Sequence, residues 1–284
     1  MVGGRDGLTW LAPVDGEDTE LFDSIARCRI GEIEFDCSCD DRATGRSQPG
    51  RFFIHKDRRM VEEYVDVIDG FANGNIVELG IAEGGSVSLT ALVATPRKLV
   101  ALELDEKRVP ALDQLIEELG FSDRIRPYYG VDQADRARVR AIVDDEFNDR
   151  QLDLVVDDAS HRLEQTRASF ETLFPRLRPG GLFLIEDWNH QHLWNRALAA
   201  ALADPASPFH AEIERSLAAG AAVEAPLTRL IIELLLAQAE SDEHLSSVTA
   251  GPNWVAVRRA DGHLDPARFR VSDLITDHMG LLPD

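Results

Sequence analysis

Residues 75–86 read NIVELGIAEGGS. The first five are mostly apolar, which is typical of a strand buried inside a sheet, and glycines follow at positions 80, 84 and 85. A helical pattern begins at Ser86. A glycine-bearing turn between a strand and a helix lets a ligand approach the backbone and the amino end of the helix closely. The segment therefore predicts a strand, a ligand-binding turn and a helix in succession.

The same alternation continues on both sides of this turn. Residues 58–71 carry apolar side chains at helical spacing before Asn73-Gly74 interrupts the pattern. Towards the C-terminus we predict strands at 98–104, 124–129, 152–156 and 182–185, separated by helices at 109–119, 134–147 and 163–177. Strands that alternate with helices of this length pair in parallel through right-handed crossovers. The chain therefore predicts an α/β fold with a doubly wound, mostly parallel sheet of the Rossmann-like type.

The two ends of the chain and one long insertion lie outside this alternation. Residues 1–50 are rich in Gly, Asp and Arg and contain a predicted helix at 20–29 and a predicted strand at 31–35. An Ala- and Leu-rich stretch after Trp188 predicts helices, and residues 245–248 and 254–259 predict an antiparallel hairpin on the sheet edge. We expect an N-terminal appendage at 1–50, a main domain at 51–260 with a helical insertion at about 189–240, and a C-terminal tail at 261–284.

Composition narrows the class of partner. The chain has 284 residues, 44% of them hydrophobic, which is enough to bury the core of one main domain. A formal net charge of −21 disfavours nucleic acid and anionic membrane surfaces as partners. Cys28, Cys37 and Cys39 form neither a disulfide framework nor a zinc motif. Because no signal peptide opens the chain and its longest apolar run, 230–239, is far shorter than the ~20 residues of a membrane span, we expect a soluble, cytoplasmic protein.

Two carboxylates indicate the kind of cofactor. Glu78 precedes Gly80 by two residues, where a carboxylate would repel the pyrophosphate of NAD and would suit a positively charged cofactor. Glu103 ends the next predicted strand, where it is well placed to accept hydrogen bonds from a ribose diol. Both dinucleotide and nucleoside cofactors use that second contact. The turn therefore favours a cationic nucleoside cofactor, and an NAD-linked oxidoreductase stays as an alternative.

A second group of acidic residues follows two neighbouring predicted strands. Asp157, Asp158 and His161 come after one strand, and Glu186-Asp187 come after the next. Four carboxylates at one sheet edge repel one another unless a cation compensates, and such an oxygen-rich group suits Mg²⁺, Mn²⁺ or Ca²⁺ better than zinc. We predict Asp158, Glu186 and Asp187 as the metal ligands. Whether Asp157 or Asp158 faces the metal depends on the strand register, which the sequence leaves open.

With these residues in place, the chain resembles the class I S-adenosylmethionine-dependent methyltransferases. The Glu78-x-Gly80-x-x-x-Gly84 turn looks like their first motif, Glu103 like their ribose-binding acid, and residues 130–133 like the loop beside the adenine. The resemblance covers about residues 55–188 and the terminal hairpin. It implies a cofactor site formed by Glu78, Gly80, Ala82, Gly84, Ser86, Glu103, Asp132, Gln133 and Asp157.

The acidic group narrows the resemblance to metal-dependent O-methyltransferases. Asp158 and Glu186-Asp187 match their metal ligands, and His161 falls where those enzymes keep a catalytic base. Catechol methyltransferases have a lysine at that place, so the chain looks closer to the macrocin-type sugar O-methyltransferases and the related cephalosporin hydroxylase family. Residues 51–56 lie where related enzymes approach the carboxylate of the cofactor. The implied cofactors are S-adenosylmethionine and Mg²⁺ or Mn²⁺.

An alcohol is a poor nucleophile at neutral pH, so its methylation needs a metal that acidifies the hydroxyl and a base that removes the proton. Histidine titrates close to neutral pH, and we assign the base to His161 and a catalytic role to Asp158. Trp188, His190, His192 and Trp194 follow the metal pair and would suit stacking on a sugar or phenolic ring.

The expected function is O-methylation of a hydroxyl on a sugar or glycosylated metabolite. A phenolic or catechol acceptor, an NAD-linked oxidoreductase and a catalytically silent cofactor-binding module stay open as alternatives. The expected partner is a small hydroxylated acceptor and not a nucleic acid or a membrane, and we expect a homo-oligomer, a dimer.

Overall fold

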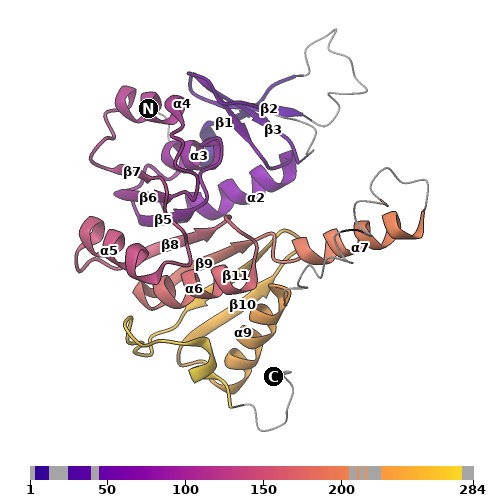
Figure 1. Ribbon diagram of the computed structural model, residues 1–284. Helices are drawn as coiled ribbons and strands as arrows, with labels where there is room; N and C mark the ends of the chain where they lie inside the picture. The colour runs from indigo at the N-terminus through magenta and orange to yellow at the C-terminus, as the bar shows by residue number, and fades with distance from the viewer. Residues whose placement is uncertain are drawn as a thin grey trace.

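The structure is a computed structural model that describes residues 4–12, 25–39, 45–204, 210, 215 and 225–276. These residues form a four-stranded sheet and a seven-stranded sheet. Figure 1 shows the smaller sheet stacked at one end of the molecule, with the larger sheet and its helices below it. The strands of the larger sheet are β5 (Asn75–Leu79), β6 (Lys98–Leu102), β7 (Ile125–Tyr128), β8 (Leu152–Asp157), β9 (Leu177–Glu186), β10 (Leu245–Ala250) and β11 (Trp254–Arg259).

The larger sheet has the strand order β10-β11-β9-β8-β5-β6-β7. Strands β5 to β9 pair in parallel, whereas β11 pairs antiparallel with β9, and β10 antiparallel with β11. All five residues of β5 are buried, as expected for a parallel strand that is covered on both faces. The predicted α/β fold and the C-terminal antiparallel hairpin are therefore confirmed.

Helices cover both faces of this sheet. They are α2 (Arg58–Asp69), α3 (Gly85–Val93), α4 (Pro110–Glu118), α5 (Arg136–Phe147), α6 (Leu163–Leu173) and α9 (Thr228–Glu240). A further helix, α7 (His190–Ala203), follows β9. Side chains alternate between the faces of a strand, so Ile76 packs in one hydrophobic cluster with α2, α3 and α4, while Val77 and Leu79 pack in the other with α5, α6 and α9. This two-sided burial confirms the doubly wound arrangement.

Between β8 and β9, the observed elements differ from the predicted ones. The helix expected at 163–177 ends at Leu173, and a single 3₁₀ turn (Phe174–Arg176) leads directly into β9. Pro175 has no N–H to continue the helical hydrogen bonds, and the ring of Phe174 stacks on Phe170 at a centroid distance of 4.6 Å. Residues 178–181, between the predicted helix and the strand predicted at 182–185, are the irregular start of β9, where the pairing with β8 shifts register.

The N-terminal region forms a sheet of its own with the order β1 (Leu8–Trp10), β2 (Ala26–Ile30), β3 (Ile33–Cys37) and β4 (Arg51–Ile54). The helix predicted at 20–29 is wrong over 26–29, which are strand, and 20–24 lie outside the described residues. Buried Cys28 and Ile30 alternate with the more exposed Arg29, which is the period of a strand. The strand predicted at 31–35 is β3, two residues later.

The four-stranded sheet shares its core with the main sheet. Phe35 and Phe52 belong to the same hydrophobic cluster as Ile76 of β5. Residue 50, the expected boundary of the appendage, falls between β3 and β4, which pair in parallel. A Cβ atom on Gly85, the first residue of α3, would lie 2.2 Å from the carbonyl oxygen of Phe53, so β4 and α3 are in close contact.

The predicted helical insertion contains α7 and α9, and Figure 1 shows α7 extending away from the body of the molecule. The C-terminal tail contains the 3₁₀ helix η3 (Val271–Leu274), and residues 277–284 lie outside the described part of the chain. Among the described helices, none is both long enough and apolar enough to cross a membrane.

Candidate active site

The turn between β5 and α3 lies against the loop that follows β8. Gly80 has φ +97°, and a Cβ atom added to it would lie 2.2 Å from the carbonyl oxygen of Asp158. Ala82 and Gly84 also have positive φ, 45° and 79°. Glycine is required at position 80 both by its backbone conformation and by this close approach. The predicted cofactor turn and the predicted metal loop are therefore neighbours.

Glu103 lies at the end of β6, beside this turn. Its Oε2 atom accepts hydrogen bonds from the backbone N–H groups of Ile81 and Ala82, both at 2.8 Å, and Oε1 accepts one from the N–H of Asp105 at 3.0 Å. The structure thus brings the predicted ribose-binding acid into direct contact with the predicted cofactor turn. Oε1, which accepts one hydrogen bond, keeps a further lone pair.

Glu78 is buried at 1% exposure between α2 and α3. Its Oε2 accepts hydrogen bonds from Tyr64 at 3.4 Å and from Thr90 at 3.2 Å. Burial raises the pKa of Glu78 to about 7, although the hydroxyl of Ser86, in the first turn of α3, stabilises the charged form. A cationic ligand nearby would favour ionisation of this carboxyl.

Asp157 and Asp158 point to different places. The Asp157 carboxylate accepts hydrogen bonds from the Gln133 amide, at 3.0 Å to each oxygen, and from the Ser169 hydroxyl at 2.5 Å. Burial raises its pKa to about 6. The Gln133 oxygen accepts a hydrogen bond from the N–H of Ser160, so Gln133 links Asp157 to the backbone of the loop after β8. Asp158 is the member of the pair that faces the carboxylates of β9.

Asp132 lies in the loop between β7 and α5. Its Oδ1 accepts a hydrogen bond from the N–H of Ala134 at 2.8 Å. The side chain therefore shapes the turn that leads to α5, next to Gln133.

Asp158, His161 and Asp187 come together at the carboxyl ends of β8 and β9. The His161 Nε2 atom lies 3.9 Å from Asp158 Oδ1 and 3.8 Å from Asp187 Oδ2. One ligand atom from each residue lies within 4.8 Å of the others, and all three side chains are half-buried. His161 and Asp187 have φ values of 55° and 48°, which are uncommon for residues with side chains and are concentrated at functional sites.

The Glu186 side chain, 1% exposed, lies deeper than Asp187. The Lys56 ammonium donates hydrogen bonds of 2.7 Å to Asp158 Oδ2 and to Glu186 Oε2. Burial disfavours the charge on Lys56, but the attraction of the two carboxylates outweighs it and raises the pKa of Lys56. Burial and the charge of Asp158 raise the pKa of Glu186, which Lys56 opposes.

The residues present fit a divalent cation. Glu186 Oε1 is buried and has no hydrogen-bond partner among the described residues. Asp158 Oδ1 and Asp187 Oδ2 are not the oxygens that Lys56 occupies. Carboxylate oxygens of this kind are the ligands preferred by Mg²⁺ and Mn²⁺. Of the predicted metal ligands, the structure brings Asp158 and Asp187 together with His161 and places Glu186 beside Lys56.

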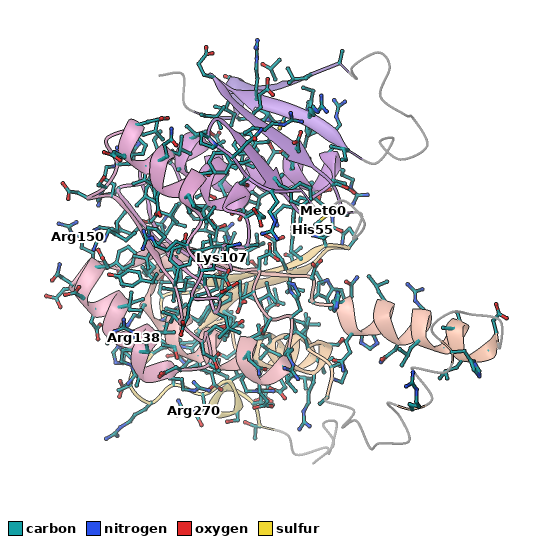
Figure 2. All side chains as sticks on the ribbon, turned by 45° about the horizontal axis from the view of Figure 1, so that its top comes forward. His55, Met60, Lys107, Arg138, Arg150 and Arg270 are labelled. Carbon is teal, nitrogen blue, oxygen red and sulfur yellow. The ribbon has the colours of Figure 1, made fainter. Side chains whose placement is uncertain are left out.

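The contact of Lys56 with the acidic group was not predicted, and residues 51–56 were associated with the cofactor instead. The chain leaves β4 through His55 and enters α2 near Met60, and Figure 2 labels both residues at this junction. The available signal was the rarity of lysine, since Lys56 is one of three lysines among 30 basic residues.

The residues after the metal pair divide into two groups. The His190 ring lies beside His161, with ring centroids 5.6 Å apart. Trp188 donates a hydrogen bond to the carbonyl of Gly251, and His192 contacts the hydroxyl of Thr228 at 2.5 Å, so both anchor the start of α7. The side chain of Trp194 lies outside the described part of the chain.

Part of the chain is similar to known methyltransferases. Residues 77–188 match the family described as Methyltransferase domain. The 8-demethyl-8-alpha-L-rhamnosyl tetracenomycin-C 2'-O-methyltransferase of Streptomyces olivaceus is 40% identical over 74 residues, which cover 21% of this chain and 20% of that protein. Demethylmacrocin O-methyltransferase of Streptomyces fradiae is 58% identical over 36 residues, 13% of this chain and 9% of that protein.

One similar solved structure is the MycE methyltransferase from the mycinamycin biosynthetic pathway, in complex with Mg, SAH and mycinamycin VI. It is 23% identical, with a TM-score of 0.48, and the match covers 70% of this chain and 49% of that chain. The matched segments span a fifth or less of the two curated relatives. The family match over 77–188 confirms the resemblance to methyltransferases, and it includes the glycine turn, Glu103 and the acidic residues of β8 and β9.

Proposed function

We propose that this chain, whose residues 77–188 match the family described as Methyltransferase domain, transfers a methyl group from S-adenosylmethionine to a hydroxyl of a sugar or glycosylated metabolite, with the help of a divalent metal. The observation that carries the proposal is the position of Asp158, His161 and Asp187 next to the glycine turn at residue 80. The names of the two curated relatives describe O-methyltransferases, one of a rhamnosyl compound and one of demethylmacrocin.

The cofactor site we propose consists of the glycine turn with Glu78, Ser86 and Glu103, and of Asp132, Gln133 and Asp157 around it. S-adenosylmethionine carries a sulfonium and an ammonium group, which suits a turn bordered by carboxylates, while the pyrophosphate of NAD would be repelled. Gly80, Ala82 and Gly84 leave the backbone of the turn open to the ligand.

In the proposed mechanism, Asp158, Glu186 and Asp187 hold the cation, Mg²⁺ or Mn²⁺. When bound, a divalent cation supplies Lewis-acid chemistry that makes an alcohol hydroxyl more acidic. His161 then removes the proton of the acceptor hydroxyl, since its Nε2 faces the two carboxylates. The methyl group transfers in line, so the remaining contribution of the chain is to position the acceptor and exclude water.

The proposed acceptor is a small molecule because the net charge of −21 opposes binding to phosphate backbones and anionic lipids. A homodimer is part of the proposal, and sedimentation velocity on the full chain tests it directly.

Calorimetric titration with S-adenosylhomocysteine, with and without Mg²⁺ and with NAD as the control, tests the choice of cofactor. We expect the homocysteine compound to bind and NAD not to bind. Binding of NAD in its place would overturn the interpretation of Glu78 and, with it, methyl transfer.

Asp158→Asn tests the metal role. Removing one negative ligand weakens the cation site but leaves the glycine turn in place, so methyl transfer to a glycosylated acceptor should be lost while affinity for S-adenosylhomocysteine changes little. Excess chelator should have the same effect on the unmodified chain. Asp123→Asn, at an exposed position before β7, is the matched control. Full activity in chelator would remove the metal from the mechanism.

A further inference from the structure

Lys56 is a buried cation that contacts two carboxylates, Asp158 and Glu186, and its role is not explained by the fold alone. We infer that Lys56 is a resident counter-ion that sets the net charge of the acidic group at −2, so that the group is matched to one divalent cation. The inference rests on the metal site proposed above and assigns Lys56 as a positioning and charge-setting residue of that site.

The hydrogen bonds of Lys56 occupy one oxygen of each partner. Its Nζ atom lies 2.7 Å from Asp158 Oδ2 and 2.7 Å from Glu186 Oε2. The other oxygen of Asp158 faces His161, and Glu186 Oε1 is buried with no hydrogen-bond partner among the described residues. Lys56 therefore fixes the orientation of both carboxylates from one side and leaves the second oxygen of each for another ligand.

The charges of the group do not cancel. In the form that binds a cation, Asp158, Glu186 and Asp187 are all ionised and carry three negative charges, and Lys56 contributes one positive charge, which leaves −2. The ion pairs found for these carboxylates among the described residues involve only Lys56 and His161, and a neutral imidazole adds no charge. One divalent cation completes the neutralisation, whereas a partly buried group left at −2 is unfavourable, most of all for the buried Glu186.

Lys56 is held in place by the elements on either side. It follows β4 of the N-terminal sheet and precedes Asp57, whose carboxylate caps α2 by accepting a hydrogen bond from the N–H of Met60. The Nζ atom also lies 5.3 Å from the ring centroid of the fully buried Tyr64. A side chain held by β4, α2 and a buried ring is positioned by the fold, so the N-terminal sheet contributes a charge to the proposed metal site.

A comparison of a divalent with a trivalent ion separates charge from positioning. Mn²⁺ and Tb³⁺ both prefer carboxylate oxygens, so a general loss of positioning should weaken the binding of both ions and largely cancel in the ratio of their affinities. A change in net charge does not cancel, because the ion of higher charge responds more strongly. The probes are Mn²⁺, measured by calorimetry, and Tb³⁺, measured by luminescence, both on the full chain.

In Lys56→Met the group carries −3, and we expect the Tb³⁺/Mn²⁺ affinity ratio to rise by about tenfold or more. Lys56→Arg keeps the charge and should keep the ratio of the unmodified chain. The double variant Lys56→Met with Glu186→Gln returns the group to −2 and should return the ratio as well. A ratio that is the same in all four proteins overturns the inference and leaves Lys56 a structural residue.

Lys56→Met leaves carboxylates buried without a partner and can fail to fold for that reason. Glu186→Gln alone then tests the inference in the opposite direction, because the net charge of the group changes from −2 to −1. The Tb³⁺/Mn²⁺ affinity ratio should fall by a similar factor, and an unchanged ratio overturns the inference. If the unmodified chain binds neither ion, the metal site of the proposed function fails together with the inference. If it binds both ions and the Tb³⁺/Mn²⁺ affinity ratio does not change with the net charge of the group, only the inference fails.

Discussion

His161 combines a strained backbone with a central position between two carboxylates. A φ of 55° is unfavourable for a residue that has a Cβ atom. Such conformations are retained where the surrounding structure holds the side chain in a required place. The Nε2 atom faces Asp158 and Asp187, and the ring contacts His190. This arrangement is consistent with a base whose direction is set by its neighbours.

His161→Ala should lower kcat for methyl transfer by about 10² to 10⁴ while KM for the acceptor changes little, because a general base acts in the transition state and not in binding. Steady-state kinetics with the acceptor found for the unmodified chain measure both parameters. His263→Ala, at an exposed position in the C-terminal tail, is the control and should leave both unchanged. An unaltered kcat in His161→Ala would exclude it as the base.

Titration of Glu78 should make the stability of the folded chain depend on pH. Burial raises its pKa to about 7 from 4.5, so between these values only the folded chain holds the proton. The free energy of unfolding should therefore fall as pH rises through this window, by up to about 3 kcal/mol, and stay level above it. Glu78→Gln imitates the protonated form and removes this dependence.

Urea unfolding of both proteins between pH 5.5 and 8, without cofactor and with chelator, measures the difference. The stability of Glu78→Gln relative to the unmodified chain should grow with pH. Glu117→Gln, at an exposed position of α4, controls for the change in net charge. A constant difference across the range would mean that Glu78 is already ionised in the folded chain.

At the scale of elements, the contact between two loops determines whether the site forms. The turn after β5 and the loop after β8 meet at Gly80, where a Cβ atom would lie 2.2 Å from the Asp158 carbonyl oxygen. This contact joins the proposed cofactor turn to the proposed metal loop. A side chain at residue 80 would therefore disturb both at once.

Gly80→Ala should lower the free energy of unfolding by about 2 to 5 kcal/mol, the sum of a positive-φ penalty and the clash with Asp158. It should also weaken binding of S-adenosylhomocysteine. Gly120→Ala is a matched control, because Gly120 has φ +66° but no heavy atom within 4 Å of the added Cβ, so only the conformational penalty of about 1 to 2 kcal/mol applies. Equal losses in the two variants would show that the loop contact is unimportant.

At the scale of the whole molecule, the N-terminal sheet and the main sheet are built on one continuous core. Phe35 of β3 is fully buried in the same cluster as Ile76 of β5, and Lys56 passes from the end of β4 to the carboxylates of β8 and β9. The sheet therefore belongs to the cooperative unit that carries the site, although its sequence resembles an appendage.

Phe35→Ala should lower the stability of the entire chain by about 3 to 5 kcal/mol and leave a single thermal transition, followed by circular dichroism. Phe170→Ala, equally buried but in the hydrophobic cluster on the other face, should shift the same single transition. If the N-terminal sheet were an independent unit, Phe35→Ala would instead split the transition in two.

Much of the fold was open to prediction because hydrophobic spacing is a local property. The strand at 75–79, the helices that alternate with the parallel strands and the closing hairpin all follow from patterns within a dozen residues. The carboxyl ends of parallel strands meet at one sheet edge, so the grouping of the acidic residues after β8 with those at the end of β9 also followed from the sequence. The N-terminal region was predicted less well, because the pattern around Cys28 is too short to distinguish a helix from a strand.

The α/β class, the position of the glycine turn and the acidic character of the site thus follow from local sequence patterns. Three features depend on how the chain packs: Asp158 and not Asp157 faces the site, Gly80 touches the loop after β8, and Lys56 joins the carboxylates. Lys56 is 102 residues from Asp158 and 130 from Glu186 along the chain. Contacts over such separations depend on how whole elements pack, and no local pattern records them.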